Sequence, residues 1–249
     1  MALSFLLFAA NLFAQEGVRT AADKKEFSGK ILLVPYESKM YMGEVDEKIN
    51  KQTKWTSSQI NEYFRHQLDT QLKLKLQSVL SPVLTFYVDS IKTAKDLDYI
   101  YKSTAIRFDK VGTPTAPTAV DAKKEPGIKD GQVEVKMNED QKFSNIKFTS
   151  NDLVPYLNTK YKSEYFVFVN ELDIRTIPES YDLATDSYQR EVMVHYTIVD
   201  KTSKLILAGV ATAKLSSKEN NPKKIVSNAF SPIATYIATR LSMVITPKK

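Results

Sequence analysis

The chain has no cysteine among its 249 residues, and it has only two histidines and seven glycines. Without cysteine it can form no disulfide, thiolate metal site, cysteine nucleophile or lipid-modified N-terminal cysteine. His66 and His195 fall on different predicted elements, so they offer no local metal-ligand spacing. No phosphate-binding loop or dinucleotide fingerprint is found. We therefore expect neither a metal nor a cofactor, and these absences together disfavour an enzyme.

The N-terminus begins with an uncharged apolar run over residues 2–14, after which the sequence turns polar. Such a run is too short to span a bilayer as a stable helix, and its length is typical of a secretory signal peptide. We predict a signal peptide at 1–14 and a loose tether at 15–28. No other stretch is apolar for long enough to form a transmembrane segment. The mature chain is therefore predicted to be periplasmic or secreted.

The formal charge of +6 comes mostly from lysines that are spread along the whole sequence. A nucleic-acid-binding protein would gather lysine, arginine and aromatic residues on one face. The scattered pattern instead indicates a solvated surface, so no nucleic-acid partner is expected. Weak contact with anionic lipid or with acidic cell-wall polymer is compatible with this charge.

The first half of the predicted domain alternates strands and helices. Residues 30–36 contain, after Lys30, a short apolar run that is rich in branched side chains and ended by proline, as in a central strand. Thr56 and Gln59 have the spacing of a capping box, which predicts a helix start. The further elements expected here are a strand at 83–88 and a helix at 94–104.

The stretch from Lys110 to Gln141 contains several prolines and glycines and almost no large apolar side chain. It cannot bury enough surface to order itself strongly, so we predict a flexible Pro/Gly/Lys-rich excursion at 110–141. The chain then returns to the fold through Phe143, Ile146 and Phe148, and a helix is expected at 151–161.

The last hundred residues have the clearest hydrophobic pattern. A strand is predicted at 164–174, followed by an antiparallel hairpin of 190–199 with 205–215. Asn221 and Pro222 begin a long C-terminal helix, which Pro232 should kink or divide. The predicted fold is α/β (α+β): a mixed sheet of about five strands with helices packed on it, in one domain at 29–249.

This order of elements resembles a family of small envelope domains. The family includes the periplasmic domain of the curli secretion channel protein, the outer-membrane lipoprotein activators of penicillin-binding proteins and the N-terminal domain of the Tol-Pal protein TolB. The resemblance rests on the first strand at 31–36, the later strand at 163–169, the hairpin at 194–200 and 205–208, and a final helix. It covers residues 29–245, and it implies a non-catalytic domain that docks onto other envelope proteins or onto itself.

Three departures limit what the resemblance implies. The lipidated members begin at a cysteine, which this chain lacks, and the excursion at 110–141 is longer than a minimal domain needs. No segment resembles the membrane-spanning hairpins of a channel, so pore formation is not expected.

The connection between the first strand and the first helix contains large apolar residues in an otherwise polar segment. Aromatic and methionine side chains are favoured in the centres of interfaces, so we predict a partner-binding surface here. The alternative is that these side chains fold back and cover the sheet edge or the helix end. The predicted partner-binding residues are Tyr36, Met40, Tyr41, Met42 and Trp55.

A different function is suggested by Glu171 and Asp173, which alternate on a predicted strand and so point to one face. Glycosidases use a pair of carboxylates to hydrolyse glycosidic bonds, so the alternative is a secreted hydrolase of polysaccharide or cell wall. Arg175 could instead simply compensate their charge. A third hypothesis, a small-ligand carrier, requires an enclosed apolar cavity.

Overall fold

The structure is a computed structural model that describes residues 27, 29–88, 90–110 and 142–246. The predicted signal peptide, nearly all of the tether and residues 111–141 of the predicted excursion lie outside the described residues.

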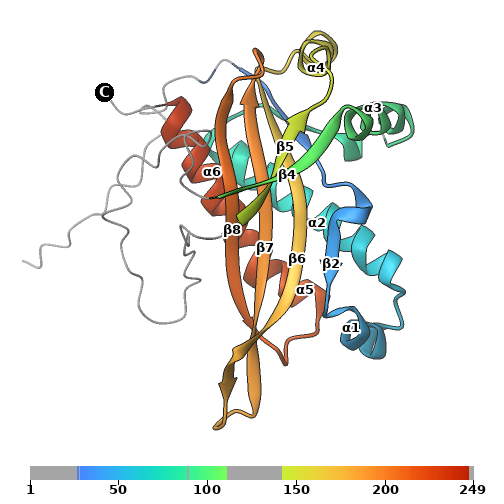
Figure 1. Ribbon diagram of the computed structural model, residues 1–249, viewed down its shortest axis with the longest axis vertical. Coiled ribbons are helices and arrows are strands. Elements are labelled where there is room, and N and C mark those ends of the chain that lie inside the picture. Colours follow the sequence, from blue (N-terminus) through green and yellow to red (C-terminus); the bar gives the residue numbers. More distant parts are fainter. Residues whose placement is uncertain (1–26, 28, 89, 111–141, 247–249) are drawn as a thin grey trace, which may run out of the picture.

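A six-stranded mixed sheet forms the centre of the fold (Figure 1). Five strands follow the order β3-β1-β6-β7-β8, and β2 pairs with a later part of β6. The pairings of β1 with β3 and β6 and of β2 with β6 are parallel, whereas β6, β7 and β8 are antiparallel. The strands are β1 (Ile31–Val34), β2 (Tyr41–Gly43), β3 (Val83–Thr85), β6 (Tyr165–Asp182), β7 (Ser187–Asp200) and β8 (Leu205–Ser216).

Helices α2 and α6 cover one face of this sheet, behind it in Figure 1. Helix α2 begins with the predicted capping box, in which Gln59 N donates to Thr56 Oγ1 and Thr56 N donates to Gln59 Oε1. Its buried Phe64 meets Phe230 edge to face, with the ring centroids 5.3 Å apart. The helices of the fold are α1 (Asp46–Thr53), α2 (Ser57–Val79), α3 (Ser90–Lys102), α4 (Leu153–Tyr161), α5 (Pro222–Ile225) and α6 (Ser231–Ile245).

The opposite face of the sheet carries α3, α4 and a two-stranded antiparallel ribbon, which crosses in front of the sheet in Figure 1. The ribbon consists of β4 (Thr104–Lys110) and β5 (Lys142–Phe148). Phe166 and Phe168 of β6 are buried on this face, whereas Val167 and Val169 are buried on the other face, in the core that α2 and α6 cover. The sheet is therefore covered on both sides, which explains its almost unbroken apolar strands.

The predicted fold class is confirmed: the sheet is mixed, helices pack on it and a long helix ends the fold. The predicted count of about five strands misses β2, which has only three residues. The strand predicted at 83–88 ends at Thr85 and continues as the 3-10 turn Phe86–Val88. The C-terminal helix is divided, as expected near Pro232, by the π-helical turn Val226–Phe230.

Candidate functional site

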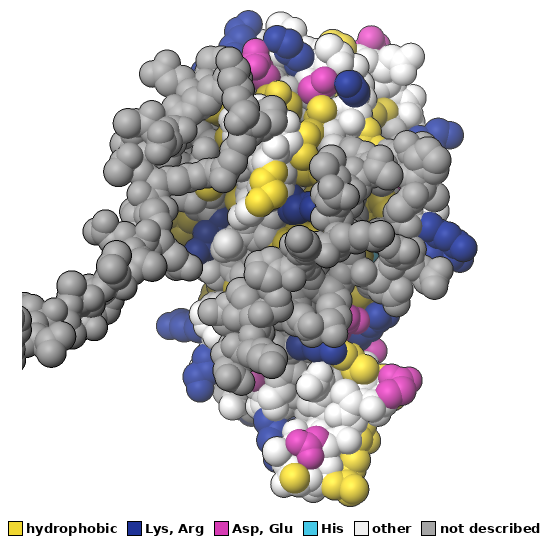
Figure 2. All heavy atoms as spheres, turned by 90° about the vertical axis from the view of Figure 1, so that its left-hand side faces the viewer, with side chains coloured by type: hydrophobic (Ala, Val, Ile, Leu, Met, Phe, Trp, Pro, Cys, Tyr) yellow, Lys and Arg dark blue, Asp and Glu magenta, His cyan; other side chains and the backbone are white. Residues whose placement is uncertain are grey.

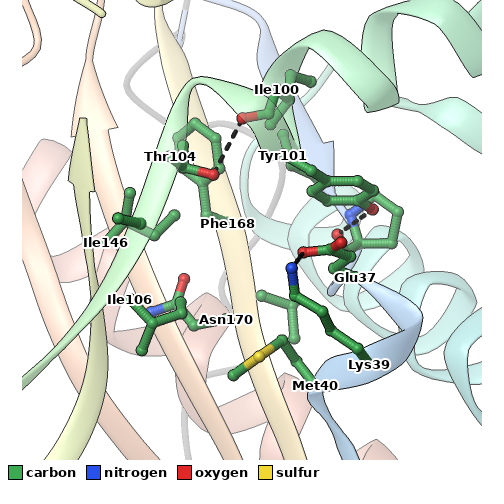
Figure 3. A pocket seen from close by; sticks show the side chains of 14 residues that line it. Glu37, Lys39, Met40, Ile100, Tyr101, Thr104, Ile106, Ile146, Phe168 and Asn170 are labelled. Atoms are coloured by element: carbon green, nitrogen blue, oxygen red, sulfur yellow. Dashed lines mark hydrogen bonds and ion pairs between the residues drawn. The ribbon is translucent and has the colours of Figure 1, made fainter. Parts of the chain in front are cut away.

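A cavity of about 250 Å³ lies beside the ribbon, at the carboxyl end of β1 (Figure 3). We call it the Asn170 cavity, after the residue at its floor. Its walls come from four separate parts of the chain and are mostly apolar. The lining residues are Val34, Pro35, Glu37, Lys39, Met40, Ile100, Tyr101, Thr104, Ala105, Ile106, Ile146, Phe168, Val169 and Asn170.

The polar side chains in the wall are mostly engaged with other groups. Glu37 pairs with Lys39 at 2.8 Å. The Tyr101 hydroxyl donates to Pro35 O at 2.8 Å and accepts from Arg65 Nη2 at 2.7 Å, and burial raises the pKa of Tyr101 to about 12. Thr104 Oγ1 donates to Ile100 O at 3.0 Å. These groups shape the wall, and none of the ionisable ones is set up as a free nucleophile or base.

Asn170 reaches the cavity because the pairing of β6 with β7 shifts by one residue at this point. Neighbouring residues of a regular strand face opposite sides of the sheet, but this bulge turns both Asn170 and Glu171 toward the ribbon. Asn170 Nδ2 donates to Ser144 O at 2.7 Å, and Ser144 Oγ donates to Glu171 Oε2. One residue of β5 therefore contacts both side chains.

His195 belongs to the same buried polar layer beneath β5. It is the register partner of Glu171, and its Nδ1 accepts a hydrogen bond of 2.8 Å from Ser144 N–H. A nitrogen that accepts a hydrogen bond carries no proton, so this histidine is neutral, and burial lowers its pKa below the ordinary value. His195 and Glu171 thus hold the ribbon on the sheet and lie outside the cavity wall.

The five predicted partner-binding residues do not form one exposed surface. Tyr36 is buried in the core, and Met40, Tyr41 and Trp55 are partly buried against it. Only Met42 among the five is strongly exposed, at 51%. Met40 lines the Asn170 cavity, and Trp55 packs on Tyr63 with ring centroids 5.0 Å apart. Whether this segment binds a partner stays a prediction.

The two predicted carboxylates lie on one face of β6, as the alternation indicated. Glu171 is buried under β5, and Asp173 is half-buried. Burial raises the pKa of Asp173 to about 6, and Arg175 opposes this increase. The hydrolase hypothesis required both carboxylates in one cleft, but neither belongs to the lining of the Asn170 cavity.

A second surface feature is the end of the β6–β7 hairpin, which projects beyond the helices and the ribbon (Figure 1). We call residues 178–189 the hairpin tip. Hydrophobic side chains stand on this projection in Figure 2. Leu183 is 86% exposed, and the exposed rings of Tyr181 and Tyr188 lie against each other with centroids 4.9 Å apart. A hollow of about 530 Å³ beside the tip is lined by polar residues that include Lys214 and Lys218.

Hydrogen bonds hold the hairpin tip in one shape. Asp182 Oδ1 accepts from Ala184 N at 2.9 Å, and Asp182 Oδ2 accepts from the Thr185 hydroxyl at 2.9 Å. The Tyr181 hydroxyl donates to Asp186 at 2.7 Å. Local bonds of this kind stabilise a turn and reduce the entropy that binding would otherwise cost.

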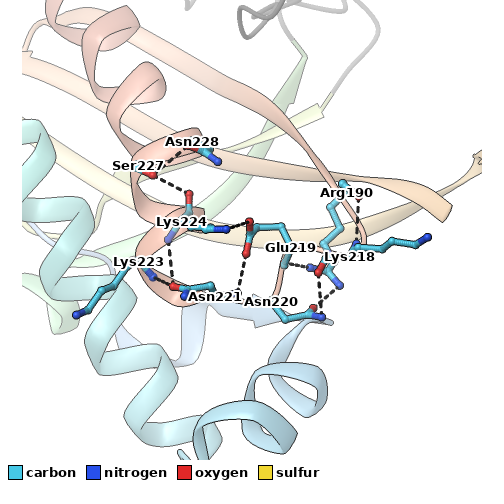
Figure 4. A network of polar contacts seen from close by, with 10 residues as sticks. Arg190, Lys218, Glu219, Asn220, Asn221, Lys223, Lys224, Ser227 and Asn228 are labelled. Atoms are coloured by element: carbon cyan, nitrogen blue, oxygen red, sulfur yellow. Dashed lines mark hydrogen bonds and ion pairs between the residues drawn. The ribbon is translucent and has the colours of Figure 1, made fainter. Parts of the chain in front are cut away.

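A buried arginine anchors the base of the hairpin (Figure 4). Arg190 Nη1 donates to Glu219 O at 2.6 Å, and Nη2 donates to Ser217 O at 2.6 Å and to Asn220 Oδ1 at 3.0 Å. Burial lowers the pKa of this guanidinium, which makes its hydrogen-bond partners necessary. The hairpin is thereby tied to the loop between β8 and α5.

Sequence reasoning did not find either feature. The Asn170 cavity joins residues near positions 35, 100, 146 and 170, and no local pattern relates them. The hairpin tip left a weak signal: Leu183 is an isolated large apolar residue in a polar stretch. Such a residue has no strand or helix period to bury it.

In the part of the chain that the structure describes, no three His, Asp or Glu side chains gather as a metal ion would require. No helix among the described residues has both the length and the apolar character needed to cross a bilayer. No protein-family model matches the sequence, and the search of curated proteins finds no relative. The resemblance to envelope domains therefore stays a prediction.

Proposed function

We propose that the chain is a non-enzymatic interaction domain of the Gram-negative cell envelope, which binds a partner protein through the hairpin tip after export. It would serve as an accessory or assembly factor of a secretion, outer-membrane or cell-wall complex. One observation carries the proposal: an exposed leucine and a tyrosine pair stand on a projection whose turn and base are both held by hydrogen bonds.

Apolar side chains that stay in water cost free energy, which a partner surface would recover by covering them. Leu183 contributes almost nothing to the core, because nearly all of its surface is in solvent. Aromatic side chains that are rigid and partly exposed make good interface anchors, since little entropy is lost when they bind. The hollow beside the tip supplies lysines and hydroxyl groups for a polar rim.

The proposed location follows from the apolar run at 1–14, which is the feature that predicts export. Cell fractionation tests this part by itself. The protein should appear in the periplasm or the medium, with its N-terminus near residue 15. A cytoplasmic protein with an intact N-terminus would contradict it.

Partner binding is tested by photo-crosslinking in living cells. A photoreactive amino acid at Leu183 should capture one exported protein, which mass spectrometry then identifies. The matched control is Leu74, which is 55% exposed on α2, in the body of the fold and away from the hairpin tip. A third position, Met42, tests the surface that the sequence predicted.

The purified partner then allows a quantitative test. Leu183→Gln should weaken binding at least tenfold, whereas Leu74→Gln should leave it unchanged. Equal crosslinking from Leu183 and Leu74, or an affinity that Leu183→Gln does not alter, would contradict the proposal. Capture from Met42 alone would move the interface to the predicted segment.

A further inference from the structure

The Asn170 side chain contains a buried hydrogen-bond acceptor that no described residue satisfies. Asn170 is only 3% exposed, and its Oδ1 has no hydrogen-bond partner. In Figure 3 this oxygen points between Ile106 and Phe168, toward the cavity that Asn170 helps to line. Because the oxygen itself is fully buried, a donor reaches it when a side chain of the lining, such as the exposed Ile106, moves aside. Leaving a buried amide oxygen unpaired costs on the order of 1–3 kcal/mol, so such atoms call for an explanation.

The orientation of the amide follows from its neighbours. Ser144 O can only accept, so the amide group that faces it at 2.7 Å must be the NH2 group. The Thr197 hydroxyl donates to Asn145 Oδ1 at 2.6 Å, so it can accept the second N–H of Asn170, at 2.8 Å. Exchanging the oxygen and nitrogen of Asn170 would break both bonds. The atom that faces the cavity is therefore an acceptor.

The rest of the wall defines what could meet this acceptor. Glu37 and Lys39 neutralise each other, and Tyr101 and Thr104 already donate their hydroxyl protons to backbone carbonyls. Most other lining side chains are aliphatic or aromatic. The cavity thus offers apolar contact and one strong acceptor, and it offers no uncompensated charge. The volume of the cavity is only about 250 Å³, so its ligand must be small as well.

We infer that the Asn170 cavity binds a small, uncharged, mostly apolar molecule that donates one N–H or O–H hydrogen bond to Asn170 Oδ1. This inference does not depend on the hairpin tip or on any protein partner. The hydrogen-bond donor gives specificity, because a ligand without a donor would leave the buried oxygen unpaired. Apolar contact with the wall supplies most of the affinity.

The test uses two isomers as probes, 3-methylindole and 1-methylindole. They have the same atoms and nearly the same shape, but only the first has an N–H group. Calorimetric titration of the full mature chain should show 3-methylindole binding about tenfold more tightly, which corresponds to one hydrogen bond to a buried acceptor. In NMR spectra, the methyl signals of Ile100, Ile106 and Ile146 should shift, while those of Ile60 and Ile233 on the far face should not.

Two variants test whether the Asn170 cavity is where the isomers bind and whether Asn170 causes the preference between them. Asn170→Leu keeps the side-chain size and removes the acceptor, so the preference between the isomers should disappear. Because this change also takes a donor away from Ser144 O, the variant could fail to fold. Ile106→Trp is therefore used alongside it: it fills the mouth of the cavity from a partly exposed position and should reduce the affinity for both isomers at least tenfold.

Three results would overturn the inference: equal affinity of the two isomers for the wild-type chain, binding that shifts isoleucine signals away from the cavity, or no binding of either isomer at millimolar concentration. Each of these can be read from the wild-type chain and from Ile106→Trp, even if Asn170→Leu does not fold.

Discussion

Arg190 Nη2 lies 2.6 Å from the carbonyl oxygen of Ser217, so that a buried guanidinium joins the base of the β6–β7 hairpin to the loop after β8. The hairpin tip projects beyond the helices and the ribbon, and the loop after β8 also bonds to it through Ser217 and Lys218. Its orientation therefore depends on this junction, and the stability of the two regions should be coupled.

Replacing Arg190 with methionine should lower the free energy of unfolding by about 2–4 kcal/mol. The variant would leave the carbonyl oxygens of Ser217 and Glu219 without their donor in a buried place. Urea unfolding followed by circular dichroism measures the change. Arg175→Met is the matched control: Arg175 is exposed and pairs with Glu191, so its loss should cost less than about 1 kcal/mol. Equal losses in the two variants would contradict the anchoring role of Arg190.

Leu183 should be dispensable for folding. Leu183→Gln is expected to change the free energy of unfolding by no more than about 0.5 kcal/mol, because the side chain is in solvent. Leu172→Ala, a fully buried position on the same strand, should cost about 2–5 kcal/mol. A large loss in Leu183→Gln would mean that the leucine supports the fold rather than a partner.

Asp69 should make the protein less stable as the pH rises. Burial raises the pKa of this carboxyl to about 7, although Thr85 donates a hydrogen bond to it. The folded state then binds a proton that the unfolded chain releases near pH 4, so stability falls between about pH 4 and pH 7.

Asp69→Asn keeps the acceptor for Thr85 and removes the ionisation. Between pH 5 and pH 8 the variant should gain about 2–3 kcal/mol in the free energy of unfolding relative to the wild type. An unchanging difference would contradict the raised pKa.

His195 should make the protein less stable as the pH falls, which is the opposite of the effect of Asp69. Its pKa is lowered by burial, so the folded state resists protonation that the unfolded chain accepts near pH 6.5. The stability contributed by the neutral ring is present above that pH and is lost as the pH falls. His195→Asn retains an acceptor for Ser144 N–H but cannot become charged. Wild type should therefore lose stability relative to this variant between pH 7 and pH 5 in thermal melts. A parallel decline of both proteins would rule out His195 as the titrating group.

The main elements of the fold could be read from local patterns. The capping pair Thr56 and Gln59 marks the start of α2, and Asn221 with Pro222 marks the start of the divided C-terminal helix. These signals work because hydrogen bonds between residues three or four apart decide them. The strands β4 and β5 were not predicted as strands. They pair with each other across residues 111–141, so neither has a local partner in the sequence.

The candidate sites were much harder to predict. The alternation in β6 correctly placed Glu171 and Asp173 on one face, but the bulge that adds Asn170 to this face depends on pairing with β7. Likewise, the apolar residues between β1 and α2 predicted a partner-binding surface, with packing onto the sheet edge or the helix end as the alternative, and the structure packs most of them onto the core. Composition shows which side chains are apolar but not which surface buries them.

The sequence by itself determined the fold class, the starts of the main helices, the lack of thiol chemistry and the expectation of export, because periodicity, capping and composition act over a few residues. Only the tertiary structure decided that Asn170 faces a cavity, that His195 is buried and neutral beneath β5, and that Leu183 stands at the end of a braced hairpin. Each of these depends on segments that are distant in the chain and meet only when the sheet has formed, and burial and hydrogen bonding then assign each side chain its chemistry.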